Sequence, residues 1–425
     1  MAGTASRSRR RLTGAVRRLW GMLVVLALVA LAVPGHAQRA KLVVMMPGLS
    51  AGVYPDGVVE GFREKHPEID LEVLDVPWGD LQKIPVMAAG GTLPDVWYAE
   101  AGRASEWGYA GILQDLKPYI DRDLNVNDFF LLEASSDPQG RVWGIPGGFQ
   151  MTTLYYRTNL FDQAGVAYPD DSWNVNDLVD AARKLTRRSG DQVTQYGFHS
   201  PTGGTNGWIL WVHLLGGSVM DETFTRSRMN TPETIAAIEF MRSLMWVEQV
   251  SPKYGIESGY SFENDNLAME FNIYIRNNTL RQAGVTTYDV AKVPAAPDGR
   301  RSTTVVPNVW MMAKDSPAQE AGWTFLKYYI SPDVQDKVVA KGSEVPVNRE
   351  SGVAFLNQPP PPQNRLAVLE SFEFARTLDE NAAWSQWWSA VRQELLPTFG
   401  NEESAAAGAA RAHQRLQSIL DAVYR

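Results

Sequence analysis

The chain has 425 residues, a formal net charge of −8 and no cysteine. This length is enough for two domains with separate hydrophobic cores. The acidic balance and the lack of a basic block exclude the phosphate-neutralising surface of a nucleic-acid-binding protein. Without cysteine, the protein has no disulfide bonds and no cysteine that could carry a lipid anchor.

The first 37 residues have the composition of a cleavable secretory signal. Six arginines and no acidic residue precede the apolar run WGMLVVLALVALAV, and small residues follow it at Gly35 and Ala37. This run is shorter than the roughly 20 residues of a membrane-spanning helix, which makes an uncleaved anchor the weaker alternative. Cleavage after residue 37 would change the net charge from −8 to −14 and leave no membrane-spanning stretch. We therefore predict an exported, periplasmic protein, with secretion to the medium as the alternative.

The chain after this segment begins with alternating strands and helices. Apolar runs at 41–46, 69–78 and 95–102 predict three buried strands. The helical segment after the first run ends before Pro67, and the next one ends at Gly90–Gly91. This β-α-β-α-β order is typical of a parallel sheet that is covered by helices.

The remainder is mainly helical, and proline and glycine separate its segments. Strand character returns at 152–161 and at 290–310, and the four prolines at 359–362 predict a rigid surface spacer. The predicted helices are at 173–190, 207–217, 232–249 and 319–339 and in the C-terminal tail.

Six motifs occur in the order of a known protein family. They are FREKHPEIDLEV, AAGGTLPDVWYAEAG, GILQDLKPYI, VWGIPGGFQMTTLYYRTNLFDQAGVAYPDDSWNVNDLVDAARKL, AGWTFLKYYISPDVQ and EVPVN. The chain resembles the extracellular solute-binding proteins of ABC importers, in the group that mostly captures sugars and oligosaccharides. The resemblance covers nearly all of the chain after the signal segment.

The resemblance implies the type II periplasmic binding-protein fold, in which two doubly wound α/β lobes enclose a ligand cleft. The chain would cross between the lobes three times, near 147–151, 293–303 and 345–349, at segments punctuated by glycine, proline or polar residues. The lobes would consist of 38–148 with 303–345 and of 149–302 with 346–425.

The resemblance also implies the biochemical role. We expect a monomer that binds a sugar or oligosaccharide without turnover, uses no cofactor or metal, and delivers its ligand to the permease subunits of an ABC importer. Sugar binding needs flat aromatic faces together with fixed amide, carboxylate or hydroxyl groups. The resemblance and these requirements select nine positions, each with plain packing as its alternative: Ser50, Glu100, Gln150, Asn206, Trp208, Asn272, Tyr274, Asn308 and Trp384.

Two of these positions depart from the family pattern. Tyr274 stands where tryptophan is commoner, which would weaken a stacking contact with the ligand. Asn308 belongs to the step Val306-Pro307-Asn308, where the family often has Gly-Gly-Trp. At Asn308 a polar contact would replace an aromatic one, or none would be made.

Three tryptophans, Trp384, Trp387 and Trp388, fall on one face of a predicted helix near the C-terminus. Three indoles on one stripe cannot all bind ligand, because the same helix must also dock onto the fold. We predict that Trp384, at the helix entry, stacks on the ligand and that Trp387 or Trp388 belongs to the core.

Other functions have weaker signals. The sequence 48–52, GLSAG, has the form of a nucleophile elbow, but it follows the first strand and no histidine lies in a triad context. The sequence 121–128, DRDLNVND, lacks the glycine and the final glutamate of a calcium loop. A glycoside hydrolase, a binding protein for an anionic solute such as glycerol phosphate, and an interaction protein with this fold remain open alternatives.

Overall fold

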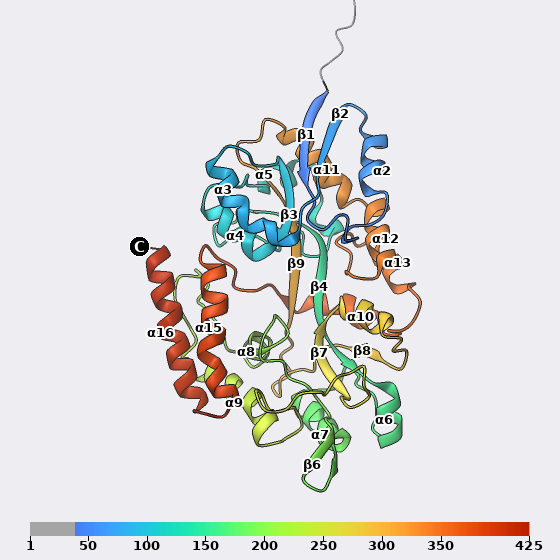
Figure 1. The fold of residues 1–425 in the computed structure, drawn as a ribbon, viewed down its shortest axis with the longest axis vertical. Coiled ribbons are helices and arrows are strands. Elements are labelled where there is room, and N and C mark those ends of the chain that lie inside the picture. Colours follow the sequence, from blue (N-terminus) through green and yellow to red (C-terminus); the bar gives the residue numbers. More distant parts are fainter. Residues whose placement is uncertain (1–38, 425) are drawn as a thin grey trace, which may run out of the picture.

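The computed structural model describes residues 39–424, so the predicted signal segment 1–37 lies outside the described residues. Figure 1 shows two lobes, one above the other. We call the part around β1, β2, β3, α2–α5, α11 and α12 the upper lobe. We call the part around β7, β8, α6–α9, α15 and α16 the lower lobe.

The strands form one mixed sheet and one small hairpin. The large sheet has the order β2-β1-β3-β9-β4-β7, with β10 beside β9 and β8 beside β4, and the hairpin pairs β5 with β6. The strands are β1 (Ala40–Met45), β2 (Ile69–Leu74), β3 (Val96–Glu100), β4 (Ile145–Tyr156), β5 (Arg187–Ser189), β6 (Gln192–Gln195), β7 (Met269–Ile273), β8 (Asp289–Ala291), β9 (Thr303–Met312) and β10 (Ala375–Arg376).

The helices of the first half cover the upper sheet and then build the lower lobe. Those in the first half are α2 (Val58–Lys65), η1 (Trp78–Lys83), α3 (Ile84–Ala89), α4 (Ala101–Tyr109), α5 (Lys117–Asp123), η2 (Val126–Asp128), α6 (Thr158–Ala164), α7 (Val175–Leu185) and α8 (Trp208–Leu214). The later ones are α9 (Pro232–Trp246), α10 (Arg276–Gln282), α11 (Gln319–Tyr329), α12 (Pro332–Lys341), α13 (Gly352–Leu356), α14 (Leu366–Glu370), η3 (Ser371–Glu373), α15 (Trp384–Phe399) and α16 (Ala405–Val423).

The predicted β-α-β-α-β start is confirmed. Strand β1 pairs in parallel with β2 and with β3, and helices provide the connections, as parallel strands require. The side chains of Leu42 and Val44 are completely buried in the upper core, because alternate residues of a strand face the same side.

Local sequence signals set several helix ends. Asn174 and Asp177 form a capping box at the start of α7, in which each side chain accepts a backbone hydrogen bond. Thr231 caps α9 and Pro232 occupies its first turn, where a missing N–H has no consequence. Helix α12 ends at Gly342, whose positive φ of 75° favours glycine.

Two long strands run from one lobe into the other. Strand β4, all of whose residues are buried, pairs antiparallel with β9 over Ile145–Met151 and then with β7 over Thr152–Tyr156. Residue 149 also exchanges backbone hydrogen bonds with Val345, in the segment predicted as the third crossing. In Figure 1, β4 and β9 stand side by side in the middle of the molecule.

Each lobe has its own large hydrophobic cluster. The upper one includes Phe62, Trp310 and Trp323, and the lower one includes Trp208, Trp211 and Trp387. Within residues 39–424, no helix combines the length and the apolar character that crossing a membrane requires.

Candidate functional site

A cleft of about 490 Å³ lies beside the middle of β4 and β9. Its walls come from elements of both lobes: the turn after β1, the ends of β3 and β7, helix α10 and the turn after α12. It is lined by Ala51, Gly52, Val53, Trp78, Glu100, Gln150, Thr205, Ile273, Ile275, Asn278, Val306, Asn308, Lys341, Ser343 and Glu344.

Three of the nine predicted site residues line this cleft, namely Glu100, Gln150 and Asn308. Glu100 ends β3, whereas Gln150 and Asn308 lie on the adjacent central strands β4 and β9. The side chain of Asn308 is half-buried, and its amide faces the carboxyl of Glu344, whose charged form it favours. A side-chain amide has further donor and acceptor positions that can bind a ligand hydroxyl.

Gln150 and Glu100 are held in place by other side chains and by the backbone. The amide of Gln150 donates to the carbonyl of Ser343 and accepts from the N–H of Ile275, both at 2.9 Å. Glu100 accepts a hydrogen bond of 3.0 Å from the indole of Trp78. These bonds fix the orientation of the cleft wall before any ligand binds, which lowers the entropic cost of binding.

A further carboxyl group in the cleft, that of Glu344, was not predicted. Burial raises the pKa of Glu344 from 4.5 to about 7, although the amides of Gln150 and Asn308 and the ammonium of Lys341 favour its charged form. The glutamate packs so closely against β4 that a Cβ on Gly148 would lie 2.4 Å from its carboxylate oxygen. The second glycine of the motif IPGG is therefore required by this close approach.

We expect the Glu344→Gln variant to change the pH dependence of stability. In the folded protein the carboxyl of Glu344 ionises near pH 7, but in the unfolded chain it ionises near 4.5. Its contribution to stability is therefore present below about pH 4.5 and is lost as the pH rises through about 7. As the pH rises from about 5 to about 8, the free energy of unfolding of the variant should increase by up to about 3 kcal/mol relative to that of the natural protein.

Denaturant unfolding of the empty protein at about pH 5 and at about pH 8 measures this difference in stability. Glu350→Gln, which changes an exposed glutamate six positions later, is the matched control and should leave the pH dependence as it is. An identical pH dependence in the natural protein and in Glu344→Gln would contradict the assigned environment of Glu344.

Three other predicted residues lie near the cleft without lining it. Ser50 lies in the exposed turn after β1, where its backbone N–H donates to Asp75. The amide of Asn206 donates to the carbonyl of Phe271 at 2.7 Å, and Asn272 accepts from the N–H of Ile273 at 3.0 Å. The side-chain amides of Asn206 and Asn272 therefore bind backbone groups in this structure, whereas the contact at Ser50 is made by its backbone.

The predicted aromatic residues Trp208 and Tyr274 are buried, with 1% and 2% of their surface exposed. Tyr274 packs against Phe355 at a ring-centroid distance of 5.0 Å. Its neighbours Ile273 and Ile275 both line the cleft instead. Strand β7 ends at Ile273 and Ile275 already has helical backbone angles before α10, so the chain turns at Tyr274.

The three tryptophans of α15 divide into one buried and two partly exposed indoles. Trp387 is completely buried and donates to the side-chain oxygen of Asn381 at 3.2 Å. The rings of Trp384 and Trp388 stack with centroids 4.9 Å apart and planes at 22°. Trp208 lies beside Trp388, at 6.2 Å. Trp384 does not line the cleft described above, so ligand stacking on it stays a prediction.

The entry of α15 touches the upper lobe. The backbone N–H and the hydroxyl of Ser385 donate to the two carboxylate oxygens of Glu106 in α4, at 2.5 and 2.7 Å. The indole of Trp384 lies over Gly102, where a Cβ would be 2.2 Å from its nitrogen. We call the contact made by Gly102, Glu106, Trp384 and Ser385 the α4–α15 contact.

Sequence reasoning missed Trp78 and Lys341 as well as Glu344. Trp78 could have been found, because it follows β2 and the carboxyl ends of parallel strands meet at one edge of a sheet. Lys341 ends α12 and no local pattern marks it, whereas Glu344 begins the family motif EVPVN, which does not by itself indicate a ligand contact. Lys341 donates to the carbonyl of Tyr54 at 2.8 Å, and burial lowers the pKa of Lys341.

The weaker enzymatic and metal signals have other structural explanations. Within residues 39–424, no hydrogen bond or ion pair joins Ser50 to a histidine. His213 is buried in α8 of the lower lobe. In DRDLNVND, the carboxylate of Asp123 accepts from the indole of Trp323 at 2.6 Å and from Lys327 at 2.9 Å. These contacts tie α5 to α11.

The two lobes, the strands that run between them and the polar cleft beside those strands define a two-lobed ligand-binding protein. The chain belongs to the family described as bacterial extracellular solute-binding proteins, whose profile matches residues 48–336. This confirms the predicted family and, with the solved structures below, the predicted fold class.

Relatives by sequence cover most of the chain. A Brucella abortus (strain 2308) protein described as a binding protein is 25% identical over 353 residues, which are 78% of this chain and 82% of that protein. A maltooligosaccharide ABC transporter solute-binding lipoprotein of Streptococcus pneumoniae (strain ATCC BAA-255 / R6) is 20% identical over 351 residues, with 78% and 77% coverage.

Solved structures have the same fold. The sugar-binding protein MalE of Xanthomonas citri superposes with a TM-score of 0.78 at 19% identity, covering 90% of this chain and 98% of that one. An ABC substrate-binding protein of Listeria monocytogenes, in complex with cycloalternan, gives a TM-score of 0.76 at 22% identity, with coverage of 89% and 98%.

Proposed function

We propose that the protein captures a sugar or oligosaccharide in the cleft beside β4 and β9 and delivers it to the permease of an ABC importer. The observation that carries this proposal is the lining of the cleft. It combines the amides of Gln150 and Asn308 and the carboxyls of Glu100 and Glu344 with the indole of Trp78. Hydroxyl groups hydrogen-bond to amides and carboxyls, and the C–H face of a sugar packs on an indole.

The charges of the cleft favour a neutral ligand over an anionic one. Lys341 is the one basic residue that lines the cleft in the described part of the chain, and two carboxyl groups line it as well. A glycerol phosphate would meet both carboxyls, and Lys341 already donates to the carbonyl of Tyr54. Phosphate binding normally uses several charge-assisted hydrogen bonds.

Further parts of the proposal rest on the sequence and the relatives. The lobes would comprise 38–148 with 303–345 and 149–302 with 346–425, and the protein would act as a monomer without a cofactor. The named relatives include sugar- and oligosaccharide-binding proteins of ABC transporters. We infer export to the periplasm through a cleaved segment 1–37, and the absence of cysteine distinguishes this chain from relatives named as lipoproteins.

Calorimetry with mono-, di- and trisaccharides, maltooligosaccharides and glycerol phosphates tests the proposal. We expect saturable binding of a sugar, recovered unchanged by chromatography after long incubation. Steady release of hydrolysis products that stops in Glu100→Gln or Glu344→Gln would establish a glycoside hydrolase instead. Binding of glycerol phosphate alone would establish an anionic solute.

We expect Asn308→Ala to reduce the affinity for the sugar by about tenfold or more. One hydrogen bond to an uncharged group contributes about 0.5–1.5 kcal/mol, and a sugar hydroxyl left without its partner adds to the loss. The melting temperature of the empty protein should hardly change. Asn176→Ala, at an exposed position of α7, is the matched control and should keep the affinity. Normal affinity in Asn308→Ala would remove this residue from the binding site.

A further inference from the structure

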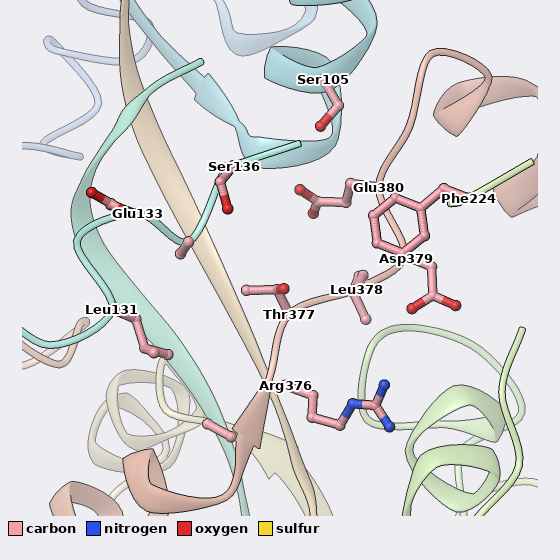
Figure 2. A pocket seen from close by; sticks show the side chains of 12 residues that line it. Ser105, Leu131, Glu133, Ser136, Phe224, Arg376, Thr377, Leu378, Asp379 and Glu380 are labelled. Carbon is pink, nitrogen blue, oxygen red and sulfur yellow. The ribbon is translucent and has the colours of Figure 1, made fainter. Parts of the chain in front are cut away.

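A second cavity, of about 420 Å³, shares no lining residue with the sugar cleft. Figure 2 shows its walls, which come from α4, from residues 131–136 of the upper lobe, from β10 and residues 377–380 after it, and from Phe224 of the lower lobe. The cavity is therefore bounded by both lobes and by the segment that leads into α15. We call it the Glu380 cavity.

The carboxyl group of Glu380 is the most unusual feature of this cavity. Only 8% of the residue is exposed, and Figure 2 shows its carboxyl directed into the cavity on the side of Ser105 and Ser136. Within residues 39–424, no hydrogen bond reaches this carboxyl, and no basic group pairs with it. A buried carboxyl without a donor is unfavourable unless it is protonated or a ligand supplies the donor.

The surrounding charges make the site electronegative. Burial, together with the carboxyls of Asp379 and Glu100, raises the pKa of Glu380 to about 8. Asp379 is engaged elsewhere, because it accepts from the N–H of Met220 at 3.1 Å. The guanidinium of Arg376 lies on the far side of the cavity in Figure 2.

The remaining lining fits a short carbon chain with an N–H donor at one end. Leu131, Leu378 and Phe224 provide apolar walls. The hydroxyls of Ser105 and Ser136 also line the cavity, on the side to which Glu380 is directed in Figure 2, and hydroxyl oxygens can accept hydrogen bonds. A carboxylate and two hydroxyl oxygens together match the three donors of a primary ammonium group.

We propose that the Glu380 cavity is a second ligand site, which binds a small organic cation through a primary ammonium group on Glu380. The carbon chain of the cation lies against Leu378 and Phe224. Near Glu380 an anion would meet the carboxyls of Glu380 and Asp379, because Arg376 lies on the far side of the cavity, and a neutral alcohol would leave the charge of Glu380 unpaired. This site is independent of the identity of the sugar in the other cleft.

The probe is propylammonium chloride, titrated into the purified full chain and measured by calorimetry at about pH 8. We expect saturable binding of one equivalent, and no saturable binding of 1-propanol or of sodium chloride at the same ionic strength. Affinity should rise from about pH 7 to about pH 9, as Glu380 becomes a carboxylate. Absence of saturable propylammonium binding, or equal binding of 1-propanol, would overturn the proposal.

Variants locate the site. Glu380→Gln should weaken propylammonium binding by about tenfold or more, because it removes a charge-assisted hydrogen bond. Its melting temperature without ligand should be at least that of the natural protein, since the change removes a buried unpaired acid. Glu133→Gln is the matched control: this glutamate also lines the cavity, but Lys117 pairs with it at 3.3 Å. Glu133→Gln should keep the affinity, and retained affinity in Glu380→Gln would overturn the proposal.

Discussion

Trp387→Ala should lower the free energy of unfolding by about 3–5 kcal/mol, the usual consequence of truncating a buried aromatic residue. The indole of Trp387 is completely buried in the core of the lower lobe and packs edge-on against Trp384 at 5.1 Å. Its N–H donates to Asn381, which is itself fully buried. The variant therefore loses packing and leaves a buried amide oxygen with one donor fewer.

Denaturant unfolding measures this loss, and Trp388→Ala is the matched control on the same helix. Trp388 is only partly buried and stacks on Trp384, so its removal should cost less than half as much. Equal destabilisation by the two substitutions, or a larger effect at Trp388, would contradict the packing of α15. Because Trp387 lies in the core and not in the sugar site, Trp387→Ala should weaken sugar binding only to the extent that it destabilises the fold.

Gly102→Ala should weaken sugar binding by about 1–3 kcal/mol, or roughly 5- to 150-fold, through steric overlap between the lobes. A Cβ at Gly102 would lie 2.2–2.4 Å from three atoms of the Trp384 indole. The substitution must push α4 away from α15 and separate Ser385 from Glu106. We therefore expect the variant to disfavour the arrangement in which the two lobes touch.

The double variant Gly102→Ala/Trp384→Ala tests this explanation. Removal of the indole relieves the overlap, so the double variant should bind the sugar no more weakly than Trp384→Ala alone. At saturating ligand, scattering should show a smaller radius for the double variant than for Gly102→Ala. Gly111→Ala would be a poor control because its φ is 74°, whereas Gly79→Ala meets no atom within 4 Å and is suitable. Sugar binding by Gly102→Ala as tight as that of the natural protein would refute a role for the α4–α15 contact.

The elements of the upper lobe could be predicted because their signals are local. The runs at 41–46 and 69–78 are apolar enough to be buried strands, and Pro67 and Gly90–Gly91 end the helices near them. Pairing of β3 with β9 could not be predicted from such signals. The two strands are far apart in the sequence, and only the complete fold brings them together.

The site was predictable where a residue ends a strand or lies at a crossing. Glu100 ends β3 and Gln150 lies at the first crossing, and both line the cleft. The direction of a side chain was harder to predict, because the chain turns from β7 into α10 at this point: Ile273 and Ile275 face the cleft, but Tyr274 does not. Glu344 enters the site through tertiary packing against Gly148, which no spacing in the sequence encodes.

The pairing of β3 with β9 also orders the events of folding. Val96 pairs with Met312 and Glu100 with Asn308, so β3 remains an open sheet edge until the chain has been synthesised past residue 312. Contacts of such long range slow folding, and open edges invite pairing with other chains. The upper lobe therefore cannot be completed before the intervening residues 149–302 have been synthesised. The export proposed above would benefit from this delay, because a chain whose sheet is still open is easier to pass across a membrane.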